Sequence, residues 1–447
     1  MAKLISADLI NNKLCILEYT TIGGQMLSFK EDAFDAKIVS HTYNEIGKII
    51  FDKPITTIGN EAFAECYNLW SVTIPDSVTA IGEKAFNYCK SLTSVTIGNS
   101  VTTIGNEAFA KCHGLTSVTI PDSVTAIGER AFAECSDVWR NQHGLRSVTI
   151  GNSVTTIGNE AFARCDYLTS VTIPDSVTAI GDRAFKDCKS LTSVTIPDSV
   201  TTIGKYAFAF CESLTSVTIP DSVTTIGGGA FTDCANLKEF KGKFAADGGR
   251  CLIIDGVLNA FALGSGVTQY TIPDSVTTIG SGAFAFCKSL TNVTIPDSVT
   301  TIGRSAFVGC NILTNVTIPD SVTTIGDRAF MDCKSLTSVT IPDSVTTIGK
   351  CAFAWCKSLT SVTIPDSVTT IGNSAFVYCE SLTNVTIGKS VSEIGRQAFK
   401  VCNIDTIVCC PKIPPKIDDS FGKFENLIVP TGCEEAYANS DWGQYLE

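Results

Sequence analysis

The chain has 447 residues, of which 17% are charged and 44% hydrophobic. This balance excludes an intrinsically disordered chain, which lacks the apolar residues needed to build a core. The formal net charge is −12 at pH 7. No cluster of lysine and arginine interrupts this acidic character, so we expect no nucleic-acid partner. The apolar runs are far too short to span a bilayer, so we also expect no membrane insertion.

The first 50 residues have a mixed composition and follow no repeat. We predict that residues 1–50 form an N-terminal cap and residues 403–447 a C-terminal cap. The physical reason is that the end units of a repeat array would otherwise expose core side chains and unpaired strand edges. The opening residues lead into polar ones instead of a sustained apolar segment, so we expect no export signal.

Residues 51–402 form an array of 23-residue units with the pattern Leu-Thr-Ser-Val-Thr-Ile-Pro-Asp-Ser-Val-Thr-Thr-Ile-Gly-x-x-Ala-Phe-x-x-Cys. A fixed period of this length predicts a solenoid in which stacked units share one core. The phenylalanine of the Ala-Phe pair, called here the marker phenylalanine, identifies fourteen units: Phe63, Phe86, Phe109, Phe132, Phe162, Phe185, Phe208, Phe231, Phe284, Phe307, Phe330, Phe353, Phe376 and Phe399.

Each unit contains two extended stretches followed by an apolar corner. In the copy that begins at Leu191, apolar and polar residues alternate up to Ile196, which predicts a strand with one buried face. A second extended stretch, residues 200–203, ends at Gly204, where we expect a positive φ angle. The Ala-Phe-x-x-Cys segment places apolar residues at i, i+1 and i+4, which predicts about one helical turn.

Two segments interrupt the period. Residues 136–142 are an insertion that we expect to form a loop, and residues 235–268 replace one unit with a divergent sequence. The divergent segment contains Asp255-Gly256 between two apolar runs, which is a strong signal for a β-hairpin with a two-residue turn.

The repeat as a whole, Leu-x-x-Val-x-Ile-Pro followed by Val-x-x-Ile-Gly-x-x-Ala-Phe-x-x-Cys, resembles the BspA-like class of leucine-rich repeat proteins over about residues 55–402. The tail, with Ile413-Pro414-Pro415, residues 427–430, Ala436-Tyr437 and Trp442, is similar to the strand and short helix that close many such arrays. The resemblance implies an α+β repeat solenoid, coiled right-handedly, with a parallel β-sheet on its concave face and short strands and helical turns elsewhere. Some members of the family are surface or secreted proteins that bind host proteins or other cells.

Twenty cysteines are present, and fourteen of them lie three residues after a marker phenylalanine. Side chains in one stacked column point the same way, so we expect free buried thiols and a reducing compartment. Together with the missing export signal this predicts a cytoplasmic protein; the alternative is a cell-surface or secreted one whose leader was removed. Cys409, Cys410 and Cys433 match no usual zinc spacing, so we expect neither metal nor cofactor.

Catalysis is poorly supported, because the three histidines His41, His113 and His143 fall in no catalytic motif. His113 and His143 occupy the same position in two units, which favours turn residues over an acid–base pair. We therefore predict a non-catalytic scaffold that mediates protein–protein interaction or adhesion.

Two surfaces are candidates for partner binding. The first is a set of side chains that vary between units near the Ala-Phe turns and in the insertion, where aromatic anchors would dominate binding energy: Trp70, Trp139, Arg140, Phe210, Trp355 and Tyr378. The second is a nearly uniform polar ribbon on the outward face of the first strand, which we expect to solvate that face or, alternatively, to bind a glycan or another ordered surface: Ser193, Thr195, Ser216, Thr218, Asn292, Thr294, Asn315, Thr317, Ser338 and Thr340.

Overall fold

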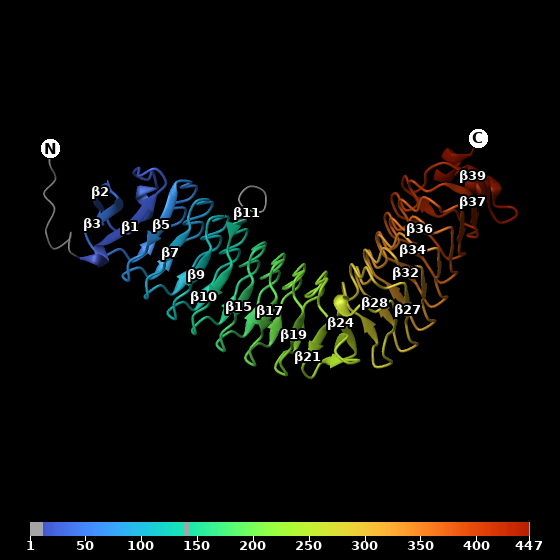
Figure 1. The fold of residues 1–447 in the computed structure, drawn as a ribbon. Coiled ribbons are helices and arrows are strands. Elements are labelled where there is room, and N and C mark those ends of the chain that lie inside the picture. The colour runs from blue at the N-terminus through green and yellow to red at the C-terminus, as the bar shows by residue number, and fades with distance from the viewer. Residues whose placement is uncertain (1–11, 138–142, 447) are drawn as a thin grey trace. The chain divides into compact units, whose positions relative to one another are not determined.

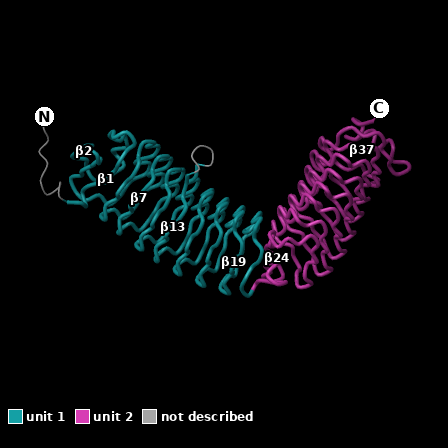
Figure 2. Tube along the Cα trace, viewed as in Figure 1, with its two compact units in different colours: residues 1–243 teal, residues 244–447 magenta. Residues whose placement is uncertain are grey.

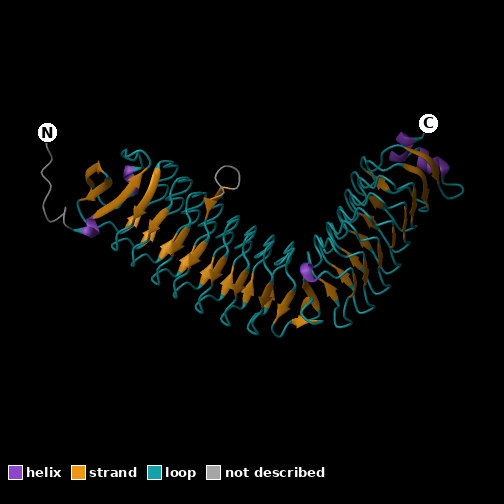
Figure 3. Cartoon of the chain, in the orientation of Figure 1, coloured by secondary structure: helices purple, strands orange, loops and turns teal. Residues whose placement is uncertain are grey.

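The computed structural model describes residues 12–137 and 143–446. The chain forms two compact units, residues 1–243 and 244–447, each with its own sheets (Figures 1 and 2). Both units are solenoids of short parallel strands (Figure 3). None of the helices in the described ranges has the length or the apolar character that a bilayer span requires.

The first unit begins with an antiparallel sheet of three strands. Leu17, Ile49 and Phe51 of these strands are fully buried, and β1 also pairs antiparallel with β5, the first strand of the first array ladder. The cap therefore extends the array sheet while it covers the end of the core. Its elements are η1 (Lys13–Cys15), β1 (Ile16–Thr21), η2 (Glu31–Ala33), β2 (Ile38–Asn44) and β3 (Ile46–Phe51).

Two strand ladders then run through the first unit. The first ladder consists of two sheets: β5 (Leu69–Thr73) and β7 (Ser94–Thr96) continue the cap sheet, and a second sheet contains β9 (Ser117–Thr119), β13 (Ser147–Thr149), β15 (Ser170–Thr172), β17 (Ser193–Thr195), β19 (Ser216–Thr218) and β21 (Glu239–Lys241). The second contains β4 (Thr57–Ile58), β6 (Ala80–Ile81), β8 (Thr103–Ile104), β10 (Ala126–Ile127), β14 (Thr156–Ile157), β16 (Ala179–Ile180), β18 (Thr202–Ile203) and β20 (Thr225–Ile226). The insertion adds a small antiparallel pair, β11 (Ser136–Asp137) and β12 (His143–Gly144).

The second unit opens with the predicted hairpin. Strands β23 and β24 pair antiparallel around Asp255 and Gly256, whose φ angles of 48° and 74° are the left-handed values that a tight two-residue turn requires. Strand β24 also pairs in parallel with β26, so the hairpin supplies the rung that the divergent sequence would otherwise omit. The opening elements are β22 (Ala245–Ala246), β23 (Cys251–Ile254), β24 (Val257–Phe261) and η3 (Leu263–Ser265).

The same two ladders recur in the second unit. The first ladder consists of two four-stranded sheets: β25 (Gln269–Thr271), β27 (Asn292–Thr294), β29 (Asn315–Thr317) and β31 (Ser338–Thr340), followed by β33 (Ser361–Ile364), β35 (Asn384–Ile387), β37 (Ile404–Cys409) and β39 (Phe424–Ile428). The second contains β26 (Thr278–Ile279), β28 (Thr301–Ile302), β30 (Thr324–Ile325), β32 (Thr347–Ile348), β34 (Thr370–Ile371), β36 (Glu393–Ile394) and β38 (Lys416–Ile417). Helices α2 (Glu434–Ala438) and η4 (Asp441–Tyr445) follow, and Tyr437 and Trp442 are buried against the core.

The prediction of a mixed α+β solenoid with helical turns is wrong. The Ala-Phe-x-x-Cys segments are chains of turns, and α2 is the only α-helix in the described residues. In every unit the residues two before and two after the marker phenylalanine have a left-handed backbone, as Glu61 (φ 60°) and Glu65 (φ 61°) do around Phe63. A left-handed residue ends an α-helix, so no helix can pass through this segment.

These turns are bonded to the neighbouring unit instead. Around Phe63, the backbone N–H groups of Glu61, Phe63 and Glu65 donate to carbonyl oxygens of the next unit at 2.7 to 2.9 Å. The residues between them bond within the turn, as Ala62 N–H does to the carbonyl of Gly59 at 3.3 Å. The Ala-Phe segment of each repeat is therefore hydrogen-bonded to the next repeat, as its strands are.

The expectation of a positive φ at Gly204 is also wrong, and a different constraint explains this glycine. A Cβ atom at Gly204 would lie 2.5 Å from the backbone nitrogen of Asp182 and 2.5 Å from the carbonyl carbon of Gly181 in the preceding unit. No side chain fits at that distance. Glycine is needed here because the backbones of successive units approach each other closely.

The core consists of columns of identical side chains. Marker phenylalanine rings of successive units are nearly parallel, with interplanar angles of 3° to 8° and centroids 5.0 to 5.6 Å apart from Phe63 to Phe231. In the second unit the same column runs from Phe284 and ends at Phe421, which packs against Trp442 with ring centroids 5.1 Å apart. Backbone hydrogen bonds between successive repeats fix this alignment, because the bond from the marker phenylalanine to the next repeat is kept even between Phe132 and Ala161, across the insertion.

The left-handed positions lead to a test at Ser305, which has a φ of 54°. We expect Ser305→Gly to change the unfolding free energy by less than about 0.5 kcal/mol, because relief of backbone strain offsets the greater freedom of the unfolded chain. Ser305→Val should destabilise by about 1 to 2 kcal/mol, because a β-branched side chain tolerates this backbone poorly. The control is Ser193→Val on the extended strand β17. Equal effects of the two valine substitutions in urea unfolding would contradict the backbone assignment.

Candidate binding surfaces

Each 23-residue repeat has one residue two positions after its marker phenylalanine. These residues form a column along each of the two compact units, called here the rim column. The φ angles of its non-glycine members lie between 53° and 64°. Glycine, the residue best suited to this backbone, occurs at only one of the fourteen positions. The members are Glu65, Tyr88, Lys111, Glu134, Arg164, Asp187, Phe210 and Asp233 in the first unit and Phe286, Gly309, Asp332, Trp355, Tyr378 and Val401 in the second.

The backbone of the rim column is held rigidly from one unit to the next. The N–H groups of Phe210, Trp355 and Tyr378 donate to the carbonyls of Thr232, Val377 and Lys400 at 2.7, 2.8 and 3.1 Å. All three aromatic side chains are partly exposed. The column therefore presents a different side chain on each unit from a fixed backbone.

Trp355 and Tyr378 are brought together, as neighbours in the rim column. Their rings stack with centroids 4.0 Å apart and an interplanar angle of 13°. The Nζ atom of Lys357 lies 5.8 Å from the centre of the Trp355 ring and also pairs with Glu380 at 2.8 Å. This arrangement combines a flat aromatic surface with a cation at its border.

The other predicted anchors lie elsewhere. Phe210 belongs to the first unit, where the Nζ atom of Lys186 lies 5.4 Å from its ring centre. Trp70 is 47% exposed but belongs to strand β5, outside the rim column. Trp139 and Arg140 lie outside the described residues.

Sequence reasoning missed an aromatic cluster at the start of the array. Tyr67 and Tyr88 meet edge to face with centroids 5.7 Å apart, and Lys90 Nζ lies 5.0 and 4.4 Å from their ring centres. His113 contacts Tyr88 from the next unit. A hydrogen bond from the Tyr67 hydroxyl to the carboxylate of Glu65 raises the pKa of Tyr67 to about 12. Comparison of equivalent positions in successive units would have revealed the cluster.

The Ser/Thr ribbon faces outward as predicted, between buried valines that align in register, as Val171 and Val194 do. Its predicted members are exposed except Ser216 and Asn292, which are half-buried. In the first unit a hollow of about 900 Å³ lies over strands β7, β9, β13 and β15, where Gly98 and Gly151 replace the usual proline. Ser117, Thr119 and Thr149 line it.

The cysteine column lies inside the core. The thiol of each column cysteine from Cys89 to Cys234 and from Cys310 to Cys402 donates to the carbonyl of the marker phenylalanine of the preceding unit, at 3.1 to 3.3 Å. Burial raises the pKa of Cys234 and Cys356 to about 12, so these thiols stay protonated and unreactive. All twenty cysteines are free; Cys351, Cys410 and Cys433 are partly exposed.

The histidines and the C-terminal cysteines occupy separate surroundings. The hydroxyl of Tyr19 bonds to His41 Nε2 at 2.6 Å, whereas His143 belongs to the short strand β12. Cys409 is buried and accepts a hydrogen bond from the Tyr437 hydroxyl at 3.3 Å. Within residues 12–137 and 143–446, no group of three or more His, Cys, Asp or Glu side chains could hold a metal ion.

Comparison with known proteins agrees with this architecture. A family model described as a BspA type leucine-rich repeat region of 6 copies matches residues 10–139, 136–245, 258–314 and 312–427. The chain belongs to this family. Its members are repeat proteins, and this BspA-type chain is a repeat-based scaffold. A search of curated proteins finds no match.

Two solved structures resemble the BspA-type chain over most of its length. A leucine-rich repeat protein from Bacteroides ovatus is 29% identical with a TM-score of 0.52, and the match covers 86% of this chain and 90% of that one. A leucine rich cell surface protein from Faecalibacterium prausnitzii is 29% identical with a TM-score of 0.55, over 94% of this chain and 96% of that one. Both support the leucine-rich-repeat type of fold.

The thiol column predicts a labelling pattern. We expect a maleimide reagent to label Cys351, Cys410 and Cys433 in the native protein and all twenty thiols after denaturation, because only these three are partly exposed. Mass spectrometry of tryptic peptides would read this out. The recovery of several disulfide-linked peptides under non-reducing conditions would contradict the column geometry.

The same column predicts a stability profile at alkaline pH. The raised pKa of the buried thiols, about 12 for Cys356 against an ordinary value of 9.0, means that the unfolded chain loses protons first. Stability from this source is complete below about pH 9 and declines as pH rises toward 12. The urea midpoint measured from pH 7 to 11 should therefore fall, and a Cys356→Ala variant should show a smaller fall than its parent.

Proposed function

We propose that this protein is a non-catalytic scaffold that binds a protein partner through the rim column. The observation that carries the proposal is the retention of large side chains on a backbone that favours glycine. A non-glycine residue with left-handed φ costs roughly 1 kcal/mol, and thirteen of the fourteen rim positions bear that cost. Retention of such strain is understandable if the side chains themselves are useful.

The composition of the rim column supports a protein partner. The column places one side chain on each repeat, and this side chain is aromatic on some repeats and acidic or basic on others. Such variety can specify a particular protein surface. The Ser/Thr ribbon repeats nearly the same residues on every unit and carries much less information. The stacked pair Trp355–Tyr378, with Lys357 beside it, is the strongest anchor within the described residues.

A second candidate function is glycan binding on the ribbon of the first unit. The hollow over β7, β9, β13 and β15 favours it, because this hollow is lined by serine and threonine residues whose hydroxyl groups can hydrogen-bond the hydroxyls of an extended sugar chain. For this second function we also propose that the solenoid coils right-handedly and that the ribbon lies on its concave face, as the sequence analysis predicts.

We propose a reducing compartment as the working location, because the protein has twenty free thiols. The alternative is the cell surface, which the resemblance to the surface protein of Faecalibacterium prausnitzii favours. Labelling of intact source cells with a membrane-impermeant maleimide at Cys351 would separate the two.

The rim proposal predicts a ranking of variants in binding. Partners would first be captured by photo-crosslinking in source cells, and the dissociation constant of each purified partner would then be measured. We expect Trp355→Ala with Tyr378→Ala to lower affinity by about 2 kcal/mol or more, as loss of aromatic anchors does. The matched control Asp332→Ala, in the same column, should have a smaller effect. Loss of binding with Thr119→Val and Thr149→Val, and none with the aromatic variants, would move the site to the ribbon and favour glycan binding.

A further inference from the structure

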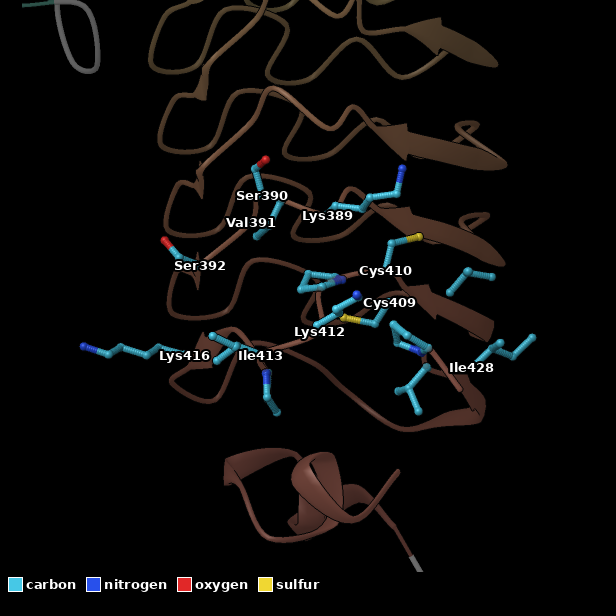
Figure 4. A pocket seen from close by; sticks show the side chains of 15 residues that line it. Lys389, Ser390, Val391, Ser392, Cys409, Cys410, Lys412, Ile413, Lys416 and Ile428 are labelled. Carbon is cyan, nitrogen blue, oxygen red and sulfur yellow. The ribbon is translucent and has the colours of Figure 1, made fainter. Parts of the chain in front are cut away.

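An apolar groove of about 870 Å³ lies near the C-terminal end of the second unit. Three successive turns of the chain line it, and they follow strands β35, β37 and β39 (Figure 4). Its apolar lining includes Val391, Val408, Ile413, Ile428 and Val429. This groove is separate from the rim column.

The groove forms where the ribbon changes from polar to apolar. Thr386 on β35 is aligned with Val408 on β37, which is aligned with Ile428 on β39. Most other units place threonine at this outward position, as Thr340 and Thr363 show. Ile428 is 53% exposed. An apolar column that faces outward on the last two strands marks a surface suited to apolar side chains of a partner.

One extra residue in the turn after β37 exposes a second isoleucine. Seven positions separate Ile387 from Ile394, whereas eight separate the equivalent Cys409 and Ile417. Counted forward from these strands, Ile413 corresponds to Val391, but Val391 is 2% exposed and Ile413 is 81% exposed.

The turn is nevertheless anchored on its inner side. The indole Nε1 of the buried Trp442 donates to the carbonyl of Pro415 at 2.9 Å. The exposure of Ile413 is therefore a fixed feature of this turn, and the side chain stays available at the border of the groove.

Strand β39 also leaves an open edge beside the groove. It is the last strand in the order β33-β35-β37-β39, and β37 is its only strand partner in the described residues. An edge strand offers backbone N–H and C=O groups to an added strand. A strand added here would place alternate side chains beside Asn426 and Ile428 and so continue the outward column.

Lysines give the groove a local positive charge. Lys389, Lys412 and Lys416 belong to its lining, and Lys389 bonds Asp366 at 2.8 Å. This local charge contrasts with the net charge of −12 of the chain. The contrast favours an acidic partner and disfavours a second copy of this chain, which carries the same net negative charge.

We propose that this groove binds an extended segment of another protein, which adds a strand to the edge of β39 and carries alternating apolar side chains flanked by acidic residues. Main-chain hydrogen bonds along β39 would supply affinity, and the contacts with Ile413, Ile428 and Lys412 would supply specificity.

A displayed library of random 12-residue peptides, selected on the purified full chain, tests this proposal. We expect selected peptides to share alternating apolar residues and at least one flanking acid. Measured by fluorescence anisotropy, their affinity should fall about tenfold or more with Ile413→Asp, Ile428→Asp and Lys412→Glu. Methylation of alternate peptide amides on one edge should have a similar effect, because it removes the donors that pair with β39.

Matched variants distinguish binding in this groove from binding elsewhere on the chain. Ile312→Asp changes another exposed isoleucine and should leave affinity within about twofold, as should Trp355→Ala in the rim column. Ile428→Thr restores the usual residue of the outward column, so it tests the groove if the aspartate variant fails to fold. The proposal would be overturned if the Ile428→Thr variant and the Ile413→Asp variant each retained full binding.

Three further results would also overturn it. These are the absence of enrichment over a selection on the Ile413→Asp/Ile428→Asp double variant, selected peptides without acidic residues, and self-association of the chain that Ile428→Asp abolishes. The last result would identify a second copy as the occupant. The rim proposal is tested on Trp355 and Tyr378, so failure of either proposal can be recognised without the other.

Discussion

The backbone hydrogen bonds between consecutive repeats are the interaction on which the rest of the solenoid depends. Strands, corners and the segments that follow them all donate to or accept from the neighbouring turn, so each residue lies beside its equivalent one unit away. This arrangement requires the paired segments of successive repeats to stay in register, and they do so even between Phe132 and Phe162, which are 30 residues apart. The phenylalanine, cysteine and valine columns are its direct consequence, because identical positions are placed on one another.

The close approach of successive turns also explains residues that local propensity does not. Glycine is retained at Gly204 because the preceding backbone occupies the place of a Cβ atom. Cysteine suits its column because a small thiol fits the core and satisfies a phenylalanine carbonyl of the unit before. In each case the neighbouring unit selects the residue.

The proposed binding surfaces arise where the repeat permits variation or fails. The rim column varies because its side chains are partly exposed, while its backbone N–H groups donate to the next repeat. The C-terminal groove arises because one additional residue after β37 displaces an isoleucine from a position that is buried in the regular units. The regular repeats form a rigid support, and the positions that depart from the repeat pattern supply the side chains that distinguish this surface.

The sequence by itself determined the solenoid, the period, the buried columns and the hairpin at Asp255-Gly256, because these features follow from spacing and from residue types with strong local preferences. Only the tertiary structure decided the conformation of the Ala-Phe segment. Its apolar spacing is compatible with a helix, but hydrogen bonds to the next unit and left-handed residues such as Glu61 and Glu65 replace the helical ones.

The candidate sites divide in the same way. Phe210, Trp355 and Tyr378 could be singled out because they vary within a constant pattern, yet the stacking of Trp355 on Tyr378 became apparent only from the structure. The groove beside Ile413 could not be predicted, because it depends on which residue of a lengthened turn is buried. The turn is also held by a hydrogen bond from Trp442 to the carbonyl of Pro415, two residues that the sequence alone does not place together.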